Sequence, residues 1–310
     1  MDTVRLAYRD PDRTPVIYCI KEMAARHYDL DVAIVRVRET EAYEAAPFDG
    51  ACDLICEHHG YLYEEVAQRR HAVAMFLAPV IDSDDNLVVG PRITGPEDLR
   101  GARVAVRARG RPFAITLQLK SLGLDDGVNI IRVDDEEVGR WGQWKKVASG
   151  ECAATFIPCL HLAPALEAGL HVLPGVGLQT VGHFVHACSS AYAQANQDVM
   201  LRYIRAAVHA ICLMKLRRNE ALDIVSGEPA RLMRLEDDRP TLERAFDCIV
   251  AALQIKPYPT PASIANAYEV ACAEWPGARG INPQTLWDLH WLKRLDDEGF
   301  IDRLIAELKG

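Results

Sequence analysis

The sequence predicts an α/β protein built of two lobes, and three observations lead to that fold class. Strand-like and helix-like segments alternate along most of the chain, as expected of sheets covered by helices. Two segments, GPEDLRGARVAV at residues 95–106 and VASGECAATFIP at residues 147–158, each lead through a glycine turn into a buried strand. The chain has 310 residues, 49% of them hydrophobic, which is enough for two lobes with ordinary cores.

The first lobe is predicted to begin with strands that pair in parallel. The expected strands are residues 3–8, 32–38 and 51–56. A polar loop at residues 9–14 leads into a helix over residues 17–27, and Pro15 suits its start because a proline lacks the N–H that has no partner there. Ligands bind at the carboxyl ends of strands in open α/β sheets, so the loops at 9–14 and 57–61 are expected to line a site.

Two crossings are predicted between the lobes. Strands at residues 73–79 and 86–89 lead out of the first lobe, and the chain returns at 183–190. One lobe is therefore residues 1–88 with 188–310 and the other is residues 89–187, with the ligand cleft between them. The second lobe is expected to contain a strand at 104–106, a helix at 116–122 and a strand at 130–133.

The last third of the chain is predicted to be a helical extension. The expected helices are residues 196–217, 240–253, 261–273, 283–295 and 301–308. Trp287, Trp291 and Leu295 recur at the i, i+4 and i+8 positions of one such helix. That spacing indicates a single packing face rather than a ligand site.

The two signature segments at residues 95–106 and 147–158 resemble, in this order, the second lobe of type II periplasmic binding proteins. More narrowly, they are similar to the branch that contains taurine and alkanesulfonate receptors and the pyrimidine-precursor proteins of thiamine metabolism. The resemblance implies a Venus flytrap fold that closes on a small ligand. It implies no particular ligand, and the cysteine-rich motif of the thiamine-pyrimidine synthases is absent.

Composition favours a small-molecule partner. The net charge is −9 and no block of Lys or Arg occurs, so we expect no affinity for nucleic acid or anionic membranes. No apolar run approaches the roughly 20 residues of a membrane helix. The phosphate-loop, dinucleotide-binding, nucleophile-elbow and zinc-protease motifs are all missing, and no cofactor is expected.

The start of the chain and its cysteines bear on the expected compartment. The first residues enter a strand directly, without the basic and apolar segments of a secretion signal. Nine cysteines are scattered without framework spacing, which fits a reducing compartment. The expected location is the cytoplasm, and the alternative is the periplasm if a leader has been removed.

The first candidate site is CEHHGYLYEE at residues 56–65. His58 and His59 follow a predicted strand and are candidate catalytic groups, since imidazole moves protons near neutral pH. The alternative is that one caps the next helix and the other is solvated. Cys52 and Cys56 share a face of the predicted strand but lie too far apart for one zinc ion. No metal is expected, although a partnership with His161, His183 or His186 is left open.

The second candidate site is RARGRPF at residues 107–113, between a strand and a helix. Backbone N–H groups at such a helix start and arginine side chains bind carboxylate, sulfonate or phosphate. Alternate residues point in opposite directions, so only one or two of the three arginines are expected to face the ligand. The expected contacts are Arg109, Gly110, Arg111 and Phe113; the alternative is a set of solvated arginines.

The third candidate site is FIPCLH at residues 156–161. His161 is a candidate acid or base, and Cys159 is either a nucleophile or a buried, inert thiol. Trp141 and Trp144 supply either an aromatic wall or core packing. The remaining expected substrate contacts are Arg9, Asp10, Arg13, Thr14, Pro158, Cys159 and His183.

Two functions follow from these sites. In the first, the protein is a cytoplasmic, cofactor-independent decarboxylase or other lyase acting on an aromatic or cyclic carboxylate, as the resemblance to dihydroxyphthalate decarboxylases and menaquinone-pathway enzymes implies. Arginines would hold the carboxylate while a histidine moves a proton. In the second, the protein is a receptor that hands a sulfonate, taurine or pyrimidine-like ligand to the permease of an ABC importer. The first is the main expectation, and a homodimer is considered.

Overall fold

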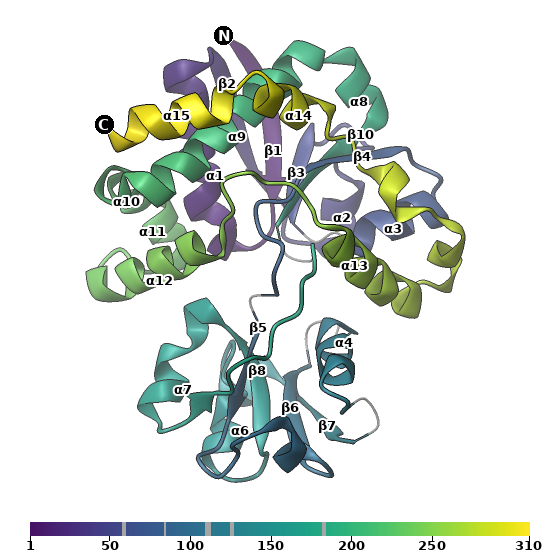
Figure 1. Ribbon diagram of the computed structural model, residues 1–310, viewed down its shortest axis with the longest axis vertical. Helices are drawn as coiled ribbons and strands as arrows, with labels where there is room; N and C mark the ends of the chain where they lie inside the picture. The colour runs from purple at the N-terminus through teal and green to yellow at the C-terminus, as the bar shows by residue number, and fades with distance from the viewer. Residues whose placement is uncertain (58–59, 84, 109–112, 125–126, 182–183) are drawn as a thin grey trace. The chain divides into compact units, whose positions relative to one another are not determined.

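The chain folds into two compact units, each with its own sheet (Figure 1). The computed structural model describes residues 1–310 except 58–59, 84, 109–112, 125–126 and 182–183. Unit 1 is Met1–Ile81 with Val181–Gly310, and unit 2 is Asp82–Thr180. The α/β fold with two lobes is as predicted, and the predicted cleft stays a prediction.

The predicted lobe boundaries at residues 88 and 187 are wrong by one strand at each crossing. Strand β5 (Asp85–Val89) pairs with β8 (Ala154–Pro158), so it belongs to unit 2. Strand β10 (Val185–Ser189) pairs with β3 (Leu54–Glu57), so it belongs to unit 1. Backbone pairing therefore decides to which unit each crossing strand belongs. The sequence could not show this, because the hydrophobic pattern of a strand does not reveal which strand it pairs with.

The sheet of unit 1 has the order β2-β1-β3-β10-β4. Its other strands are β1 (Asp2–Tyr8), β2 (Leu30–Arg36) and β4 (Val73–Leu77). β1 pairs in parallel with β2 and β3, whereas β10 runs antiparallel to β3 and β4. The parallel pairing expected of the strands at residues 3–8, 32–38 and 51–56 is confirmed. β10 runs antiparallel because it arrives from unit 2, without the helical crossover that a parallel neighbour needs.

Helices cover both faces of this sheet (Figure 1). Side chains of α1 and α9 share one apolar core with Val4 and Leu6 of β1, and those of α3 and α13 share a second core with Ala7. The alternation of side chains along β1 produces the two cores. The helices of unit 1 are α1 (Thr14–His27), α2 (Thr40–Ala45), α3 (Gly60–Ala67), α8 (Ser190–Ala195), α9 (Gln197–Leu216), α10 (Arg218–Val225), α11 (Glu228–Met233), α12 (Arg239–Ala252), α13 (Pro261–Glu274), α14 (His290–Asp297) and α15 (Phe300–Lys309).

The single helix predicted over residues 283–295 is wrong. Pro283–Leu286 is a short 3-10 turn, and α14 begins only at His290. Between them, Trp287 bridges to Met75 at the edge of the sheet, and the Asp288 N–H donates to the Met75 carbonyl at 2.8 Å. Trp287 therefore packs in a different core from Trp291 and Leu295, and the three do not form one face.

The sheet of unit 2 has the order β7-β6-β8-β5-β9. β6 (Arg103–Arg107) pairs in parallel with β7 (Asn129–Val133) and β8, while β9 (His171–Val172) extends the β5 edge. One core lies against α4 and the other against α6 and α7. The helices of unit 2 are α4 (Phe113–Ser121), α5 (Asp135–Val138), α6 (Trp144–Ala148) and α7 (Ala163–Glu167).

The two signature segments form the turns and strands that the sequence predicts. Gly101, with φ +76°, and Gly150, with φ +78°, adopt the left-handed backbone that glycine tolerates best. The first leads into β6, the second into β8. The carboxyl ends of these parallel neighbours therefore meet at one edge of the sheet.

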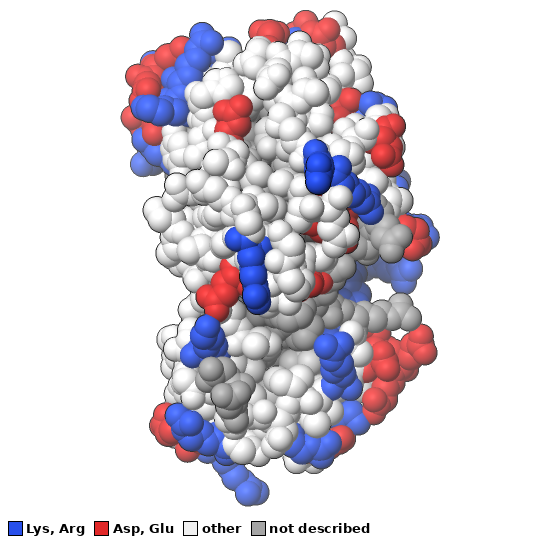
Figure 2. All heavy atoms as spheres, turned by 90° about the vertical axis from the view of Figure 1, so that its right-hand side faces the viewer, with Lys and Arg blue, Asp and Glu red and all other residues white. Residues whose placement is uncertain are grey.

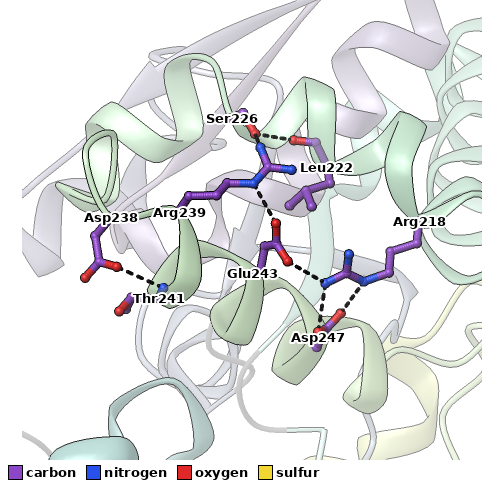
Figure 3. Close-up of polar contacts among 8 residues, drawn as sticks. All are labelled: Arg218, Leu222, Ser226, Asp238, Arg239, Thr241, Glu243 and Asp247. Carbon is purple, nitrogen blue, oxygen red and sulfur yellow. Dashed lines mark hydrogen bonds and ion pairs between the residues drawn. The ribbon is translucent and has the colours of Figure 1, made fainter.

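An ion-pair network joins α10 to α12, two helices of unit 1 (Figure 3). Arg218 donates from Nε to Oδ1 of Asp247 at 2.8 Å, and Arg239 donates from Nε to Oε1 of Glu243 at 2.7 Å. Arg239 also reaches the hydroxyl of Ser226 at 2.6 Å. These side chains are largely exposed, so the network orients the helices more than it stabilises them.

Figure 2 shows basic and acidic groups interspersed with uncharged ones on one face of the molecule. In the described part of the chain, no helix has the length and apolar character needed to cross a bilayer.

Acid should destabilise unit 1 through His209 of α9, whose Nδ1 lies 3.0 Å from the hydroxyl of Tyr28. Burial, aided by nearby His27, lowers the pKa of His209 from 6.5 to about 4. Because the neutral ring is the form favoured by the folded state, its contribution to the free energy of unfolding is complete above pH 6.5. This contribution is lost as the pH falls toward 4, and the total loss approaches about 3 kcal/mol. Urea denaturation at about pH 7 and about pH 4.5 should show that the free energy of unfolding falls less in His209→Gln than in the wild-type protein. The exposed His290→Gln is the control, and an unchanged acid loss in His209→Gln contradicts the prediction.

Candidate functional site

The carboxyl edge of the unit 2 sheet gathers a cation, a carboxylate and two aromatic rings. Arg107 is the last residue of β6, and Asp135 opens α5 just after β7. Parallel pairing places Arg107 opposite Val133, so these two strand ends are adjacent. Arg107 donates from Nε to Oδ1 of Asp135 at 2.7 Å and from Nη2 to Oδ2, a bidentate pair. The carboxylate therefore fixes the plane of the guanidinium.

The Arg107 guanidinium lies over an aromatic ring. Its Cζ is 4.7 Å from the ring centroid of Trp141, within the range of a cation–π interaction. The imidazole of His161 stacks on the same indole, with centroids 5.6 Å apart and an interplanar angle of 20°. His161 ends the short 3-10 turn that follows β8. We call Arg107, Asp135, Trp141 and His161 the unit 2 edge cluster.

A constrained turn presents Trp141. Its φ is +59°, a left-handed value that is unusual for a bulky residue. Gly139 precedes it with φ +85°, and a Cβ on Gly142 would lie 2.1 Å from the carbonyl oxygen of Val138. The Lys145 ammonium donates to that same oxygen at 2.7 Å. The turn therefore requires glycines on both sides of the tryptophan.

Several predicted site residues lie outside the described residues: His58, His59, Arg109, Gly110, Arg111 and His183. Phe113 opens α4, and its side chain is likewise outside the description. The roles expected for them stay predictions. Of the three arginines in RARGRPF, the one described is Arg107, which the sequence analysis did not favour.

Two polar side chains of the loop after β1 make local hydrogen bonds. Asp10 accepts from the Asp12 N–H at 3.1 Å, and the buried Thr14 donates its hydroxyl to the Pro11 carbonyl at 2.6 Å. Arg13 lies with Cζ 5.9 Å from the ring centroid of Phe184, and Arg9 is half-buried directly after the strand. Asp10 and Thr14 thus build the entry to α1, a role the sequence analysis did not assign to them.

His186 on β10 is a buried structural group. Its Nδ1 lies 2.8 Å from the hydroxyl of Tyr203, and burial lowers its pKa from 6.5 to about 3. Cys52 and Cys56 pack in different cores, so the expectation that they share a strand face is wrong. Strand β3 begins only at Leu54, after Cys52. Within the described ranges, no group of three His, Cys, Asp or Glu residues could hold a metal ion.

The cysteines differ in their chemical surroundings. Burial raises the pKa of Cys19, Cys188 and Cys212 to about 12, which leaves them protonated and unreactive at neutral pH. Cys159 is half-buried at the start of the turn that carries His161, and Pro158 before it is buried at the end of β8. Cys159 is disulfide-bonded and carries no thiol, so the predicted nucleophilic role is wrong.

Sequence reasoning named Trp141 and His161 but missed Asp135. That aspartate lies in the run DDEE at residues 134–137, which has the composition of a solvated acidic loop. Its position directly after a predicted strand was the available signal. The pairing with Arg107 depends on the order of strands in the sheet.

Comparisons with known proteins identify the fold. No family model matches the chain, and no curated protein matches its sequence significantly. The putative periplasmic sulfonate-binding protein SsuA from Methylobacillus flagellatus KT is 16% identical, with a TM-score of 0.65 over 96% of each chain. The periplasmic aliphatic sulphonate binding protein SsuA from Escherichia coli is 16% identical, with a TM-score of 0.65 over 88% of this chain and 87% of that one.

A third solved structure has the same architecture. It is a mutant of DSZB in complex with biphenyl-2-sulfinic acid, 10% identical, with a TM-score of 0.63 over 96% of this chain and 99% of that one. These likenesses show that the chain has the type II periplasmic-binding-protein-like fold, as the sequence predicted.

Replacing Gly142 by alanine should disrupt the turn that presents Trp141. The new Cβ would meet a backbone oxygen at 2.1 Å, which no side-chain movement relieves. We expect a loss of about 2 kcal/mol or more in the free energy of unfolding, measured by urea denaturation. Gly177→Ala is the matched control because nothing lies within 4 Å of its Cβ. Equal stability of the two variants would show that the turn is not constrained.

Proposed function

We propose that the protein binds a small organic anion with an apolar body, and that a sulfonate or sulfinate is its preferred anionic group. The observation that carries the proposal is the similarity over nearly the whole chain to two sulfonate-binding proteins and to a protein bound to a sulfinic acid. All three ligand descriptions share a sulfur oxyanion on an organic group.

The unit 2 edge cluster supports this ligand class. Indole and imidazole rings suit an apolar body, and the guanidinium of Arg107, paired with Asp135, lies over the indole. Arg109 and Arg111 precede α4 in the sequence and lie outside the described residues. Arginines at a helix start would add charge-assisted hydrogen bonds to an oxyanion.

We propose the receptor role as the physiological one. The protein would hand its ligand to the permease of an ABC importer, and the periplasm would then be its place of action. The two sulfonate-binding proteins of the same fold, both described as periplasmic, support this role better than the decarboxylase that the sequence analysis favoured.

A panel of anions should test the ligand class. We expect calorimetry to detect binding of alkanesulfonates or of biphenyl-2-sulfinate to the wild-type protein at micromolar concentrations, about −8 kcal/mol. Carboxylates of matching carbon skeleton should bind more weakly. Tighter binding of the carboxylates would instead support the aromatic or cyclic carboxylate that the sequence analysis expected as the ligand.

Replacing Arg109 or Arg111 should weaken anion binding more than replacing an exposed arginine elsewhere in unit 2. Arg109→Ala or Arg111→Ala should cost about 2–5 kcal/mol in binding, because the anion loses a paired charge. Arg132→Ala, an exposed arginine on β7 of the same unit, is the control for net charge. If all three variants bind the best anion of the panel equally, Arg109 and Arg111 are not ligand contacts.

Turnover separates the receptor from a lyase. A receptor returns the bound anion unchanged, whereas a lyase releases carbon dioxide or another product from a carboxylate substrate. If product forms, His58→Gln, His59→Gln and His161→Gln should identify the acid or base by a drop of about 10²–10⁴ in turnover at similar affinity.

A further inference from the structure

The indole N–H of Trp141 is a hydrogen-bond donor that the described structure leaves unused. Its Nε1 atom is buried, and it has no acceptor among the residues that the structure describes. Buried N–H groups in native proteins nearly always have a partner. The tryptophan as a whole is only half-buried, so the unused donor lies beside accessible surface.

The backbone around Trp141 is built to hold the ring in place at a conformational cost. A left-handed φ of +59° at a bulky residue persists only where its surroundings enforce it, and such outliers concentrate at ligand sites. Gly139 and Gly142 permit this turn, since neither position accepts a side chain without strain, and the Gly142 N–H closes it on the Gly139 carbonyl at 2.8 Å. Packing alone does not explain a strained turn that leaves its polar atom unpaired.

The acceptor that best suits the unused N–H is an ionised oxygen. Arg107 lies over the ring and is paired with Asp135, so this pair adds no net charge beside Nε1. An ionised acceptor forms a stronger hydrogen bond with an N–H group than a neutral one does. An oxyanion oxygen therefore suits this position better than a neutral carbonyl.

We propose that Trp141 is a specificity-determining residue, and that its indole N–H donates a hydrogen bond to an oxygen of the bound anion. The ring stacked on His161 would contact the apolar body next to that oxygen. This inference rests on the proposed function, because it names one contact of the same ligand.

Two other tryptophans, Trp291 and Trp144, differ from Trp141 in their surroundings. Trp291 already donates from Nε1 to the Gln197 side chain at 3.0 Å. Trp144 packs against the apolar core beneath α6. Trp144 lies in the same unit three residues away, and it has ordinary helical surroundings. It is therefore the matched control.

Calorimetry with butanesulfonate and biphenyl-2-sulfinate tests the proposal. Trp141→Phe keeps an aromatic ring but removes the N–H, so we expect its Kd to rise about 10- to 100-fold. Trp144→Phe should stay within about twofold of wild type. Equal affinity of wild type and Trp141→Phe would overturn the inference while leaving the proposed function intact. If the wild-type protein binds neither anion, the proposed function fails, and the inference fails with it.

A second measurement keeps the test valid if Trp141→Phe does not fold. In the wild-type protein labelled with ¹⁵N at its indoles, saturation with the anion should move the Trp141 N–H proton downfield as the hydrogen bond forms. Phenylalanine variants of the other tryptophans assign the signal by elimination. A Trp141 signal that stays in place while the anion saturates the protein would overturn the inference.

Discussion

The bidentate pair between Arg107 and Asp135 is the interaction on which the unit 2 edge cluster depends. It joins the ends of two neighbouring parallel strands, and it holds the guanidinium in a single plane. Only in that plane does Arg107 lie over Trp141, which in turn stacks on His161 after β8. A cation held in this way is both neutralised and oriented.

The second constraint is the way the chain crosses between its units. β5 and β10 each run antiparallel to the strands beside them in their own sheets. Because an antiparallel neighbour needs no helical crossover, β5 and β10 join their sheets without a connecting helix. The segments that follow β6, β7 and β8 therefore form the carboxyl edge of the unit 2 sheet.

Several parts of the fold could be predicted because they depend on neighbours in sequence. The strand β1, the helix α1 after its proline and the glycine turns at Gly101 and Gly150 all arise from local patterns. The errors occurred where distant segments compete. Trp287 lies outside the predicted helix because the edge strand β4 offers Met75 as a backbone partner.

The sequence by itself determined the α/β class, the two lobes and the three loops in which the site residues were sought. Periodicity and glycine placement encode these features locally, so they can be read without knowing what each element touches. Tertiary structure alone decided that Asp135 holds Arg107, that Trp141 is strained and that Cys52 and Cys56 pack in separate cores. Those outcomes depend on strand order and on contacts between residues far apart in the chain, and no local pattern records them.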